Sequence, residues 1–410
     1  MKWLLAFLLF QIPIFLYAQP HPLAYFIEQA TANSPALQDY QAQLLAARID
    51  SQLLNATLRP QVAFISSNSY APIINGYGYD EPISNIANVS ALVQANRNFI
   101  SRGNLAAQYR IIQLQQRAVL DTIQLSQRDL VRTITDQYLN AYSSLLQSDF
   151  NKDLYELLKK EERVLKKLTE ASVYKQTDYL SFYITMQQQE LQYLQAQIQY
   201  NADYLTLNVL AGIVDTTITR IEEPRLSGIV PTDFYHSPFY ARFITDSLRI
   251  AAERRILHYQ YKPRIGAFTD AGFNSTLQHV PYKNFGFSAG VSLAIPIYDG
   301  GQKSLQTARL LIQERRRQAN KNYYFAQYRQ QTALLQQQLR GTELLKAKIE
   351  QQITFTRTLI TANNKLLETG DITMRDYVLA INNYLAVQNV AMQNNISRLR
   401  ILNQLAYWNP

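Results

Sequence analysis

Four stretches of the chain alternate apolar and polar residues with the period of two that a β-strand produces. In the clearest stretch every odd-numbered position is apolar, and the even-numbered positions up to Ala294 are Gly, Ser or Ala. In another, Ile265 and Phe273 lie on one side and Asp270 on the other. The pattern predicts four strands, each with one apolar face, at residues 61–70, 89–99, 264–274 and 285–297.

Between the strands the chain is rich in strong helix formers. The stretches 104–171 and 302–369 contain no Pro, and their only Gly is Gly341. At about 1.5 Å per residue each predicts a helical rod of about 100 Å. Shorter helices are expected before each pair of strands, and return helices after each rod at 177–211 and 373–408.

The expected return helix 177–211 has a regular apolar seam. Its residues are spaced by three and four, as in helices that pack against one another, with Gln187 and Asn201 filling the gaps. Thr177 is the residue expected to cap the helix start. The seam consists of Leu180, Ile184, Leu191, Leu194, Ile198 and Leu205.

The elements occur twice in the same order. Ser34-Pro35, an expected helix start, recurs as Ser237-Pro238. The segment Glu170–Leu180 recurs 198 positions later as Glu368–Val378. We expect a first repeat at 19–212, an equatorial linker at 213–237 and a second repeat at 238–410, with two half-helices stacked alongside each long helix.

The first 18 residues have the pattern of a secretory signal. Lys2 precedes an apolar run from Trp3 to Leu16, and a cleavage site follows near Ala18. The alternative is a membrane anchor, but Gln11 and Pro13 interrupt the run. We expect an exported chain with no spanning helix after the signal.

Strands with one apolar face suit a transmembrane barrel, in which that face contacts lipid. The alternative is a soluble sandwich, whose apolar faces would meet a second sheet. The expected export and the lack of further strands favour the barrel. Four strands cannot close a barrel, because the smallest have about eight, so several chains must share one. A working duct favours three chains over two.

Composition and motifs offer no reactive site. The net charge of +9 comes from scattered Lys and Arg, so no nucleic-acid partner is expected, and there is no Cys. No catalytic constellation, phosphate loop or cofactor motif is found. The adjacent pairs Glu161-Glu162 and Glu222-Glu223 are expected to be solvated charges. Metal-ligand spacing is absent among the four histidines, His21, His236, His258 and His279.

Two motifs make the resemblance to a known family specific. One is the junction Ile295–Gly301, with an apolar-Pro-apolar-aromatic-Asp-Gly-Gly sequence before a long helix. The other is Gly370–Thr373, followed by Asp376. With the repeated order of elements, the chain resembles the TolC family of outer-membrane efflux and secretion ducts over essentially its whole mature length.

The resemblance implies a mainly α fold with a transmembrane β-barrel part, assembled as a homotrimer. Twelve strands would cross the outer membrane, and twelve helices would form a tunnel in the periplasm. It also implies a periplasmic adaptor and an inner-membrane pump of the RND or ABC type as partners. The first repeat departs from the pattern, since Asn98–Gly103 lacks the Pro and Asp-Gly-Gly and its tip has Ser172 in place of Gly.

The resemblance also supplies the candidate site residues. Asp376 occupies the first of two acidic positions that the family often places at its closed tip, but Leu379 occupies the second. Asp376 either narrows an opening, with Asp178 as its counterpart in the first repeat, or only favours a helix start. The remaining candidates are Gly370, Asp371 and Thr373 at the tip and Pro296, Asp299, Gly300 and Gly301 at the strand–helix junction.

The function expected from these features is passive conduction across the periplasm and outer membrane, for efflux or type I secretion. A different class, a periplasmic coiled-coil adaptor or stalk without a pore, is the alternative. An exported enzyme is a distant third.

Overall fold

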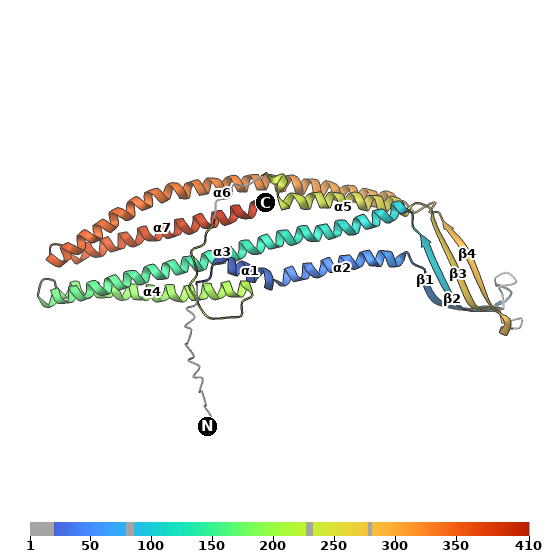
Figure 1. Ribbon diagram of the computed structural model, residues 1–410, viewed down its shortest axis with the longest axis horizontal. Coiled ribbons are helices and arrows are strands. Elements are labelled where there is room, and N and C mark those ends of the chain that lie inside the picture. Colours follow the sequence, from blue (N-terminus) through green and yellow to red (C-terminus); the bar gives the residue numbers. More distant parts are fainter. Residues whose placement is uncertain (1–19, 79–85, 227–232, 278–280, 410) are drawn as a thin grey trace, which may run out of the picture. The chain divides into compact units, whose positions relative to one another are not determined.

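The computed structural model describes residues 20–78, 86–226, 233–277 and 281–409 of the 410-residue chain. The expected signal segment 1–18 and part of the expected linker 213–237 lie outside these ranges, so both stay predictions. The chain is mainly helical with one small antiparallel sheet in its described part, which confirms the expected class of fold (Figure 1).

The helices and strands follow one another in the expected order. Two short 3₁₀ turns, Phe234–His236 and Pro281–Lys283, precede α5 and β4. Helix α6 continues through Gly341 without a break. The elements are α1 (Leu23–Asn33), α2 (Pro35–Thr57), β1 (Gln61–Ala71), β2 (Ile86–Phe99), α3 (Arg102–Glu170), α4 (Gln176–Ala211), α5 (Pro238–Gln260), β3 (Arg264–Ser275), β4 (Phe285–Ala294), α6 (Gln302–Thr369) and α7 (Met374–Trp408).

Two compact units divide the chain, and neither coincides with a half of the sequence. One, here called the tip unit, comprises Met1–Leu37, Leu125–Ser237 and Ala326–Pro410. The other, the sheet unit, comprises Gln38–Gln124 and Pro238–Phe325. Each unit draws on both halves, because α3 and α6 are long enough to contribute to both.

The sheet has the strand order β1-β2-β3-β4, with every neighbouring pair antiparallel. Its register places Phe64 opposite Val93, and Leu293 opposite Ile265. Residues directly opposite each other share a face, so most apolar positions of the four strands fall on one side, with Ile65, Leu92 and Phe268 among the exceptions. Gln94, Asp270 and Ser288 fall on the other side, where Ser288 Oγ donates to Asp270 Oδ2 at 2.9 Å.

Strand β4 ends at Ala294, three residues before the expected end at Ile297. Pro296 explains the difference, because it has no N–H for the ladder and restricts the backbone of the residue before it. Strand β2 begins at Ile86, three residues earlier than expected, and pairs there with Ala71 of β1.

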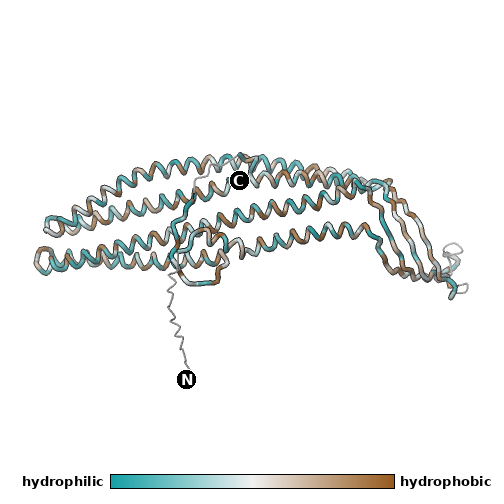
Figure 2. Tube along the Cα trace, in the orientation of Figure 1, coloured by the Kyte–Doolittle hydropathy of each residue, from teal (hydrophilic) through white to brown (hydrophobic). Residues whose placement is uncertain are grey.

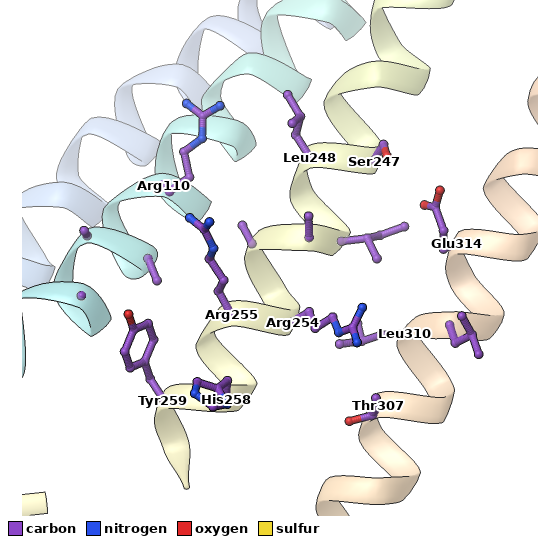
Figure 3. A pocket seen from close by; sticks show the side chains of 17 residues that line it. Arg110, Ser247, Leu248, Arg254, Arg255, His258, Tyr259, Thr307, Leu310 and Glu314 are labelled. Carbon is purple, nitrogen blue, oxygen red and sulfur yellow. The ribbon is translucent and has the colours of Figure 1, made fainter. Parts of the chain in front are cut away.

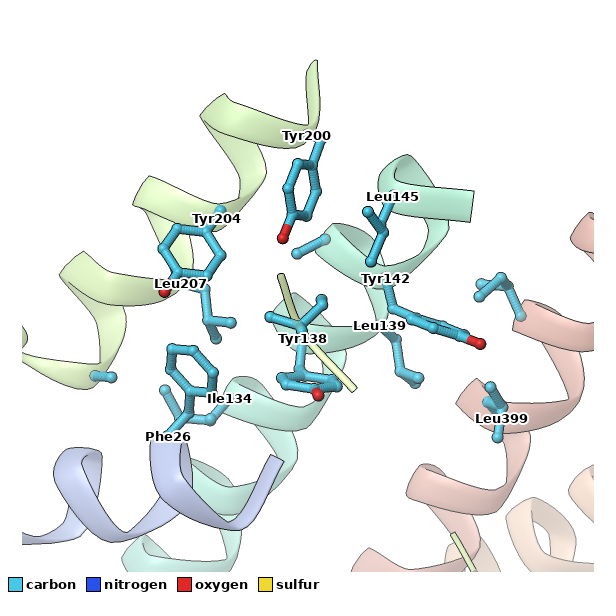
Figure 4. Close-up of a cluster of buried hydrophobic side chains, with 14 of the residues drawn as sticks. Phe26, Ile134, Tyr138, Leu139, Tyr142, Leu145, Tyr200, Tyr204, Leu207 and Leu399 are labelled. Carbon is cyan, nitrogen blue, oxygen red and sulfur yellow. The ribbon is translucent and has the colours of Figure 1, made fainter. Parts of the chain in front are cut away.

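The tip unit has a core in which α1, α3, α4 and α7 meet (Figure 4). Phe26 of α1 is fully buried and lies edge-on to Tyr138 of α3 and Tyr204 of α4, with ring centroids 5.7 and 6.1 Å apart. The Tyr138 hydroxyl donates to the carbonyls of His21 and Glu222, 3.1 and 2.7 Å away. Burial of Phe26 therefore holds α1 against α3, and the hydrogen bond to Glu222 holds the segment after α4 against the same helix.

The expected seam of α4 is not the buried face of the helix. Leu180, Ile184 and Ile198 are 50, 62 and 68% exposed in the single chain. The buried positions lie on another face and include Phe182, Met186, Gln189, Tyr200 and Tyr204. Aromatic rings bury more area per residue than Leu or Ile, and they determine which face of α4 packs against the tip-unit core.

Polar and apolar residues intermingle along every helix (Figure 2). Among the helices that the structure describes, none combines the length and hydropathy needed to cross a bilayer.

Candidate functional site

The turn between α6 and α7 contains most of the candidate tip residues. Gly370 adopts the left-handed region at φ +78°, and its N–H donates to Leu367 O at 3.3 Å. The N–H of Asp371 donates to Leu366 O at 3.0 Å. This pair of bonds is the Schellman closure of a helix C-terminus, which favours glycine at the left-handed position.

Thr373 and Asp376 begin the return helix α7. Thr373 is the N-cap, and its Oγ1 accepts from the backbone N–H of Asp376 at 3.3 Å. The same hydroxyl donates to Asp376 Oδ2 at 2.6 Å. The Asp376 carboxylate is exposed and lies in the first turn, where the helix dipole favours a negative charge. A helix-start role is thus visible in the geometry, and a role in narrowing an opening remains a prediction.

The turn between α3 and α4 closes in the same way without a glycine. Ser172 adopts φ +65°, and its N–H donates to Thr169 O at 2.9 Å. The N–H of Val173 donates to Leu168 O at 2.9 Å. A residue with a side chain costs about 1 kcal/mol in this conformation. The sequence predicted a turn here, between the helices expected at 104–171 and 177–211, but not the left-handed conformation of Ser172, because Ser carries no signal for a positive φ.

Helix α4 begins one residue earlier than expected. Lys175 is its N-cap, and Thr177 lies inside the first turn, so the prediction that Thr177 caps the helix is wrong. The Asp178 carboxylate supplies the cap in its place, because Oδ2 accepts from the backbone N–H of Lys175 at 3.4 Å. An acidic residue in the third helical position can satisfy the N-cap N–H in this way.

Tyr174 joins the two turns. Its hydroxyl lies 3.1 Å from both Leu367 O, in the last turn of α6, and Ile372 O, in the turn that follows. Val173 also approaches the second turn, because a Cβ on Gly370 would lie 3.0 Å from Val173 Cγ1. One tyrosine of the first turn therefore contacts the backbone of the second turn, a contact that no pattern in the sequence predicts.

A second tip-unit core lies beneath these turns. It includes Leu158 and Leu165 of α3, Phe182 of α4, and Leu367 and Tyr377 of the second hairpin. Tyr377 is fully buried, its hydroxyl has no hydrogen-bond partner in the described structure, and burial raises its pKa well above the usual value.

The expectation that Glu161 and Glu162 are solvated charges is wrong. Glu161 is only 4% exposed, because it lies on the same helix face as Leu158 and Leu165, three and four residues away. Glu162 is half-buried and accepts from the Tyr179 hydroxyl at 2.7 Å. That hydrogen bond, with burial, raises the pKa of Tyr179 to about 12.

The junction between β4 and α6 lies in the sheet unit. Asp299 accepts from the backbone N–H groups of Gly301 and Lys303, at 2.9 and 2.8 Å. These bonds, the one to Lys303 first, lower the pKa of the Asp299 carboxyl. Gly300 and Gly301 both have positive φ, +64° and +84°, which explains the use of two glycines there. Pro296 ends the strand, and Asp299 caps the helix.

The matching junction after β2 is built differently. Helix α3 starts at Arg102, and the Ser101 hydroxyl accepts from the Asn104 N–H at 3.4 Å. Gly103 lies inside the helix, where a Cβ would collide with the Tyr259 hydroxyl of α5. Here the glycine leaves room for the Tyr259 ring and makes no left-handed turn.

A groove of about 1280 Å³ lies between α3, α5 and α6 in the sheet unit (Figure 3). Small residues such as Ala106 and Ala251 form part of its wall. Three guanidinium groups, Arg110, Arg254 and Arg255, line it with only one carboxylate, Glu314. Within the described ranges, no group of three or more His, Cys, Asp or Glu side chains is arranged to hold a metal ion.

No family model and no curated protein sequence matches the chain. Several solved structures do match the chain. The outer-membrane channel OprN superposes with a TM-score of 0.75 at 15% identity, covering 95% of this chain and 91% of OprN. VceC, an outer-membrane protein from Vibrio cholerae, gives 0.72 at 16% identity, with coverages of 94 and 96%. The open state of the MtrE outer-membrane channel from Neisseria gonorrhoeae gives 0.74 at 11% identity, with coverages of 94 and 88%.

The chain has the fold of these outer-membrane channels. The match extends over nearly the whole described length and includes the sheet, both long helices and both hairpins. The resemblance to the TolC family is therefore confirmed at the level of the fold. At such identities the match assigns no role to an individual residue, so the tip and junction residues are argued from geometry alone.

Proposed function

We propose that the protein is the outer-membrane channel-tunnel of a tripartite efflux or type I secretion system. In this proposal it is a passive conduit, a homotrimer whose sheets form one barrel in the outer membrane and whose helices extend into the periplasm. The fold shared with the outer-membrane channels does not favour the alternative of an adaptor or stalk without a pore.

One observation carries the proposal, namely a sheet that is incomplete in a single chain. Its apolar face is open, with Phe287 86% and Val291 75% exposed. Strands β1 and β4 each have one edge unpaired within the described residues. An exposed edge is costly in lipid, because its N–H and C=O groups have no partner. Joining copies edge to edge into a twelve-stranded ring removes both edges and turns the apolar face toward lipid.

The exposed seam of α4 supports the same assembly in the tip unit. Leu191 and Leu194 are 60 and 46% exposed, in line with Leu180, Ile184 and Ile198. A helical stripe of this kind needs a partner helix, and in a trimer the neighbouring protomer supplies it.

We place the closure of the conduit at the two hairpin turns. Tyr174 would hold the second turn against the first, and the exposed carboxylates of Asp376 and Asp371 would restrict the opening by charge. A periplasmic adaptor, recruited with an RND or ABC pump in the inner membrane, would favour the open state by binding it more tightly.

The experiment is purification from outer-membrane fractions, followed by gel migration with and without heating and by conductance in planar bilayers. Heat-modifiable trimers that form discrete channels would support the proposal. A water-soluble monomer without conductance would refute it and revive the adaptor alternative.

The tip role has its own test. We expect Asp376→Asn, which removes the charge but keeps an amide oxygen that can accept from the Thr373 hydroxyl, to raise conductance. Unchanged conductance would leave Asp376 with a helix-start role alone.

A further inference from the structure

Five basic residues lie at the helix-side end of the sheet. Arg59 precedes β1, Arg97 and Arg102 flank the end of β2, Lys262 precedes β3, and Lys303 follows β4. The antiparallel register brings these positions to one end, since Gln61 pairs with Asn96 and Arg264 with Ala294. All five are exposed, and we call them the basic collar: Arg59, Arg97, Arg102, Lys262 and Lys303. Arg264 is not a member, because it shares the face of Ala294, which is opposite the apolar face.

The charge of the collar is not neutralised by the protein. None of the five forms an ion pair with a residue that the structure describes. The only acid in the neighbouring segments 57–60, 97–103, 259–266 and 295–305 is Asp299. Its carboxylate already accepts two backbone N–H bonds at the start of α6.

Aromatic and aliphatic side chains are interleaved with the collar. The Arg97 guanidinium lies 5.5 Å from the centre of the Phe99 ring. The ammonium groups of Lys262 and Lys303 lie 4.9 and 5.2 Å from the rings of Tyr259 and Tyr261. Beside them, Ile297 and Tyr298 are 95 and 89% exposed. Cations next to exposed aromatic and aliphatic groups are typical of the boundary between hydrocarbon and headgroups.

The opposite end of the sheet has a different charge. The described residues of its two connections, 72–78, 276–277 and 281–284, contain one strong base, Lys283, and no acid. The cations are therefore concentrated at one boundary of the apolar face, the boundary next to the helices.

We propose that the basic collar binds the phosphates of anionic phospholipids in the leaflet on the helix side of the sheet, which fixes the depth of the barrel in the membrane. The proposal rests on the proposed function, because it requires the sheet to span a bilayer. Charge complementarity selects the occupant, since each exposed Lys or Arg near a membrane surface favours anionic over zwitterionic lipid. The aromatic rings next to the cations favour a lipid over a soluble anion, because such rings are typical of the boundary between hydrocarbon and headgroups.

The test uses the detergent-purified protein in native mass spectrometry. Phosphatidylglycerol and phosphatidylcholine with identical acyl chains are added in equal amounts, and retained lipid is counted. We expect the wild type to retain phosphatidylglycerol preferentially. The variant Arg97→Gln, Arg102→Gln, Lys262→Gln, Lys303→Gln should show a preference for phosphatidylglycerol that is about tenfold smaller.

A matched control carries the same charge change away from the collar. Lys152→Gln, Lys160→Gln, Lys166→Gln, Lys167→Gln alters four exposed lysines of α3 in the tip unit and should keep the preference. A third variant, with Lys and Arg exchanged at the four collar positions, should also keep it and shows that the collar tolerates substitution.

Equal loss in the collar and control variants, or no preference in a wild type that forms channels, would overturn the proposal. Failure of the proposed function would look different, because the wild type would then form neither membrane-extracted oligomers nor channels.

Discussion

The two hairpin turns of the tip unit close with the same backbone hydrogen bonds but with different residues. Gly370 adopts its left-handed conformation without strain, whereas Ser172 adopts it at a cost. At the position where the second turn has Ile372, the first has Tyr174, whose hydroxyl reaches across to the second turn. The turn with the less favourable backbone conformation thus contributes the Tyr174 hydroxyl that joins the two turns. The two turns are therefore not interchangeable.

The same asymmetry extends one turn into the return helices. Tyr377 of α7 is fully buried and its hydroxyl has no partner in the described structure. Its counterpart Tyr179 of α4 is half-buried and donates to Glu162. The second hairpin therefore depends on packing at this position, and the first on a polar contact.

The largest expected effect comes from truncating these two tyrosines. Tyr377→Ala should destabilise the tip unit by about 3–5 kcal/mol, because it leaves a cavity in a closed core. Tyr179→Ala should destabilise the tip unit by clearly less, because Tyr179 is only half-buried. Thermal unfolding followed by far-UV circular dichroism measures both, and equal losses would contradict the difference between the two positions.

Exchanging the left-handed residues should give effects of opposite sign. We expect Gly370→Ala to destabilise its turn by about 1–2 kcal/mol, since it introduces a Cβ at positive φ and close to Val173. Ser172→Gly should stabilise the other turn by up to about 1 kcal/mol. Hydrogen exchange of the amides on either side of each turn reports both changes, and a shared sign would show that strain does not distinguish the turns.

Removing the joining hydroxyl should loosen the second turn more than the first. Tyr174→Phe is expected to cost about 1 kcal/mol, the usual net contribution of such a hydrogen bond. Hydrogen exchange of the backbone amides should become faster in the segment 366–373. In reconstituted channels, the conductance should increase. Tyr193→Phe on α4 is the matched control and should change neither, whereas an equal response of both variants would remove Tyr174 from this role.

The smallest effect concerns alkaline pH. The folded-state pKa of Tyr179 is raised to about 12, so unfolded chains release this proton first as the pH rises above the ordinary value near 10. The stability contributed by Tyr179 is fully present below pH 10 and is lost between about pH 10 and 12. Tyr179→Phe should reduce the slope of stability against pH in that window, and an unchanged slope would exclude Tyr179 as a source of that slope.

Periodicity within one element predicted much of the fold. The period-two alternation from Phe285 located β4 and both of its faces, and the lack of breakers indicated the long helices. The end of β4 was wrong by three residues because the alternation continues past Pro296, whose missing N–H ends the ladder. The family resemblance supplied Asp299, and the structure shows that its carboxylate accepts from the backbone N–H groups of Gly301 and Lys303.

Properties that depend on neighbouring elements could not be predicted. The seam beginning at Leu180 is regular, yet α4 buries the face that contains Phe182, because the rings of α1 and α3 meet it there. Glu161 is charged, yet its spacing from Leu158 and Leu165 places it inside. The contact of Tyr174 joins segments almost two hundred residues apart, and no pattern in either segment indicates it.

The most direct test uses the alternation of the sheet faces in a membrane. The chain has no Cys, so single cysteines can be introduced one at a time at positions 285–294 and spin-labelled in the protein reconstituted into lipid vesicles. We expect odd-numbered positions such as Phe287 to be accessible to oxygen dissolved in the hydrocarbon, and even-numbered positions such as Ser288 to a water-soluble nickel chelate. Accessibility to the chelate at every position, or to neither reagent on the apolar face, would contradict a barrel wall shared between chains.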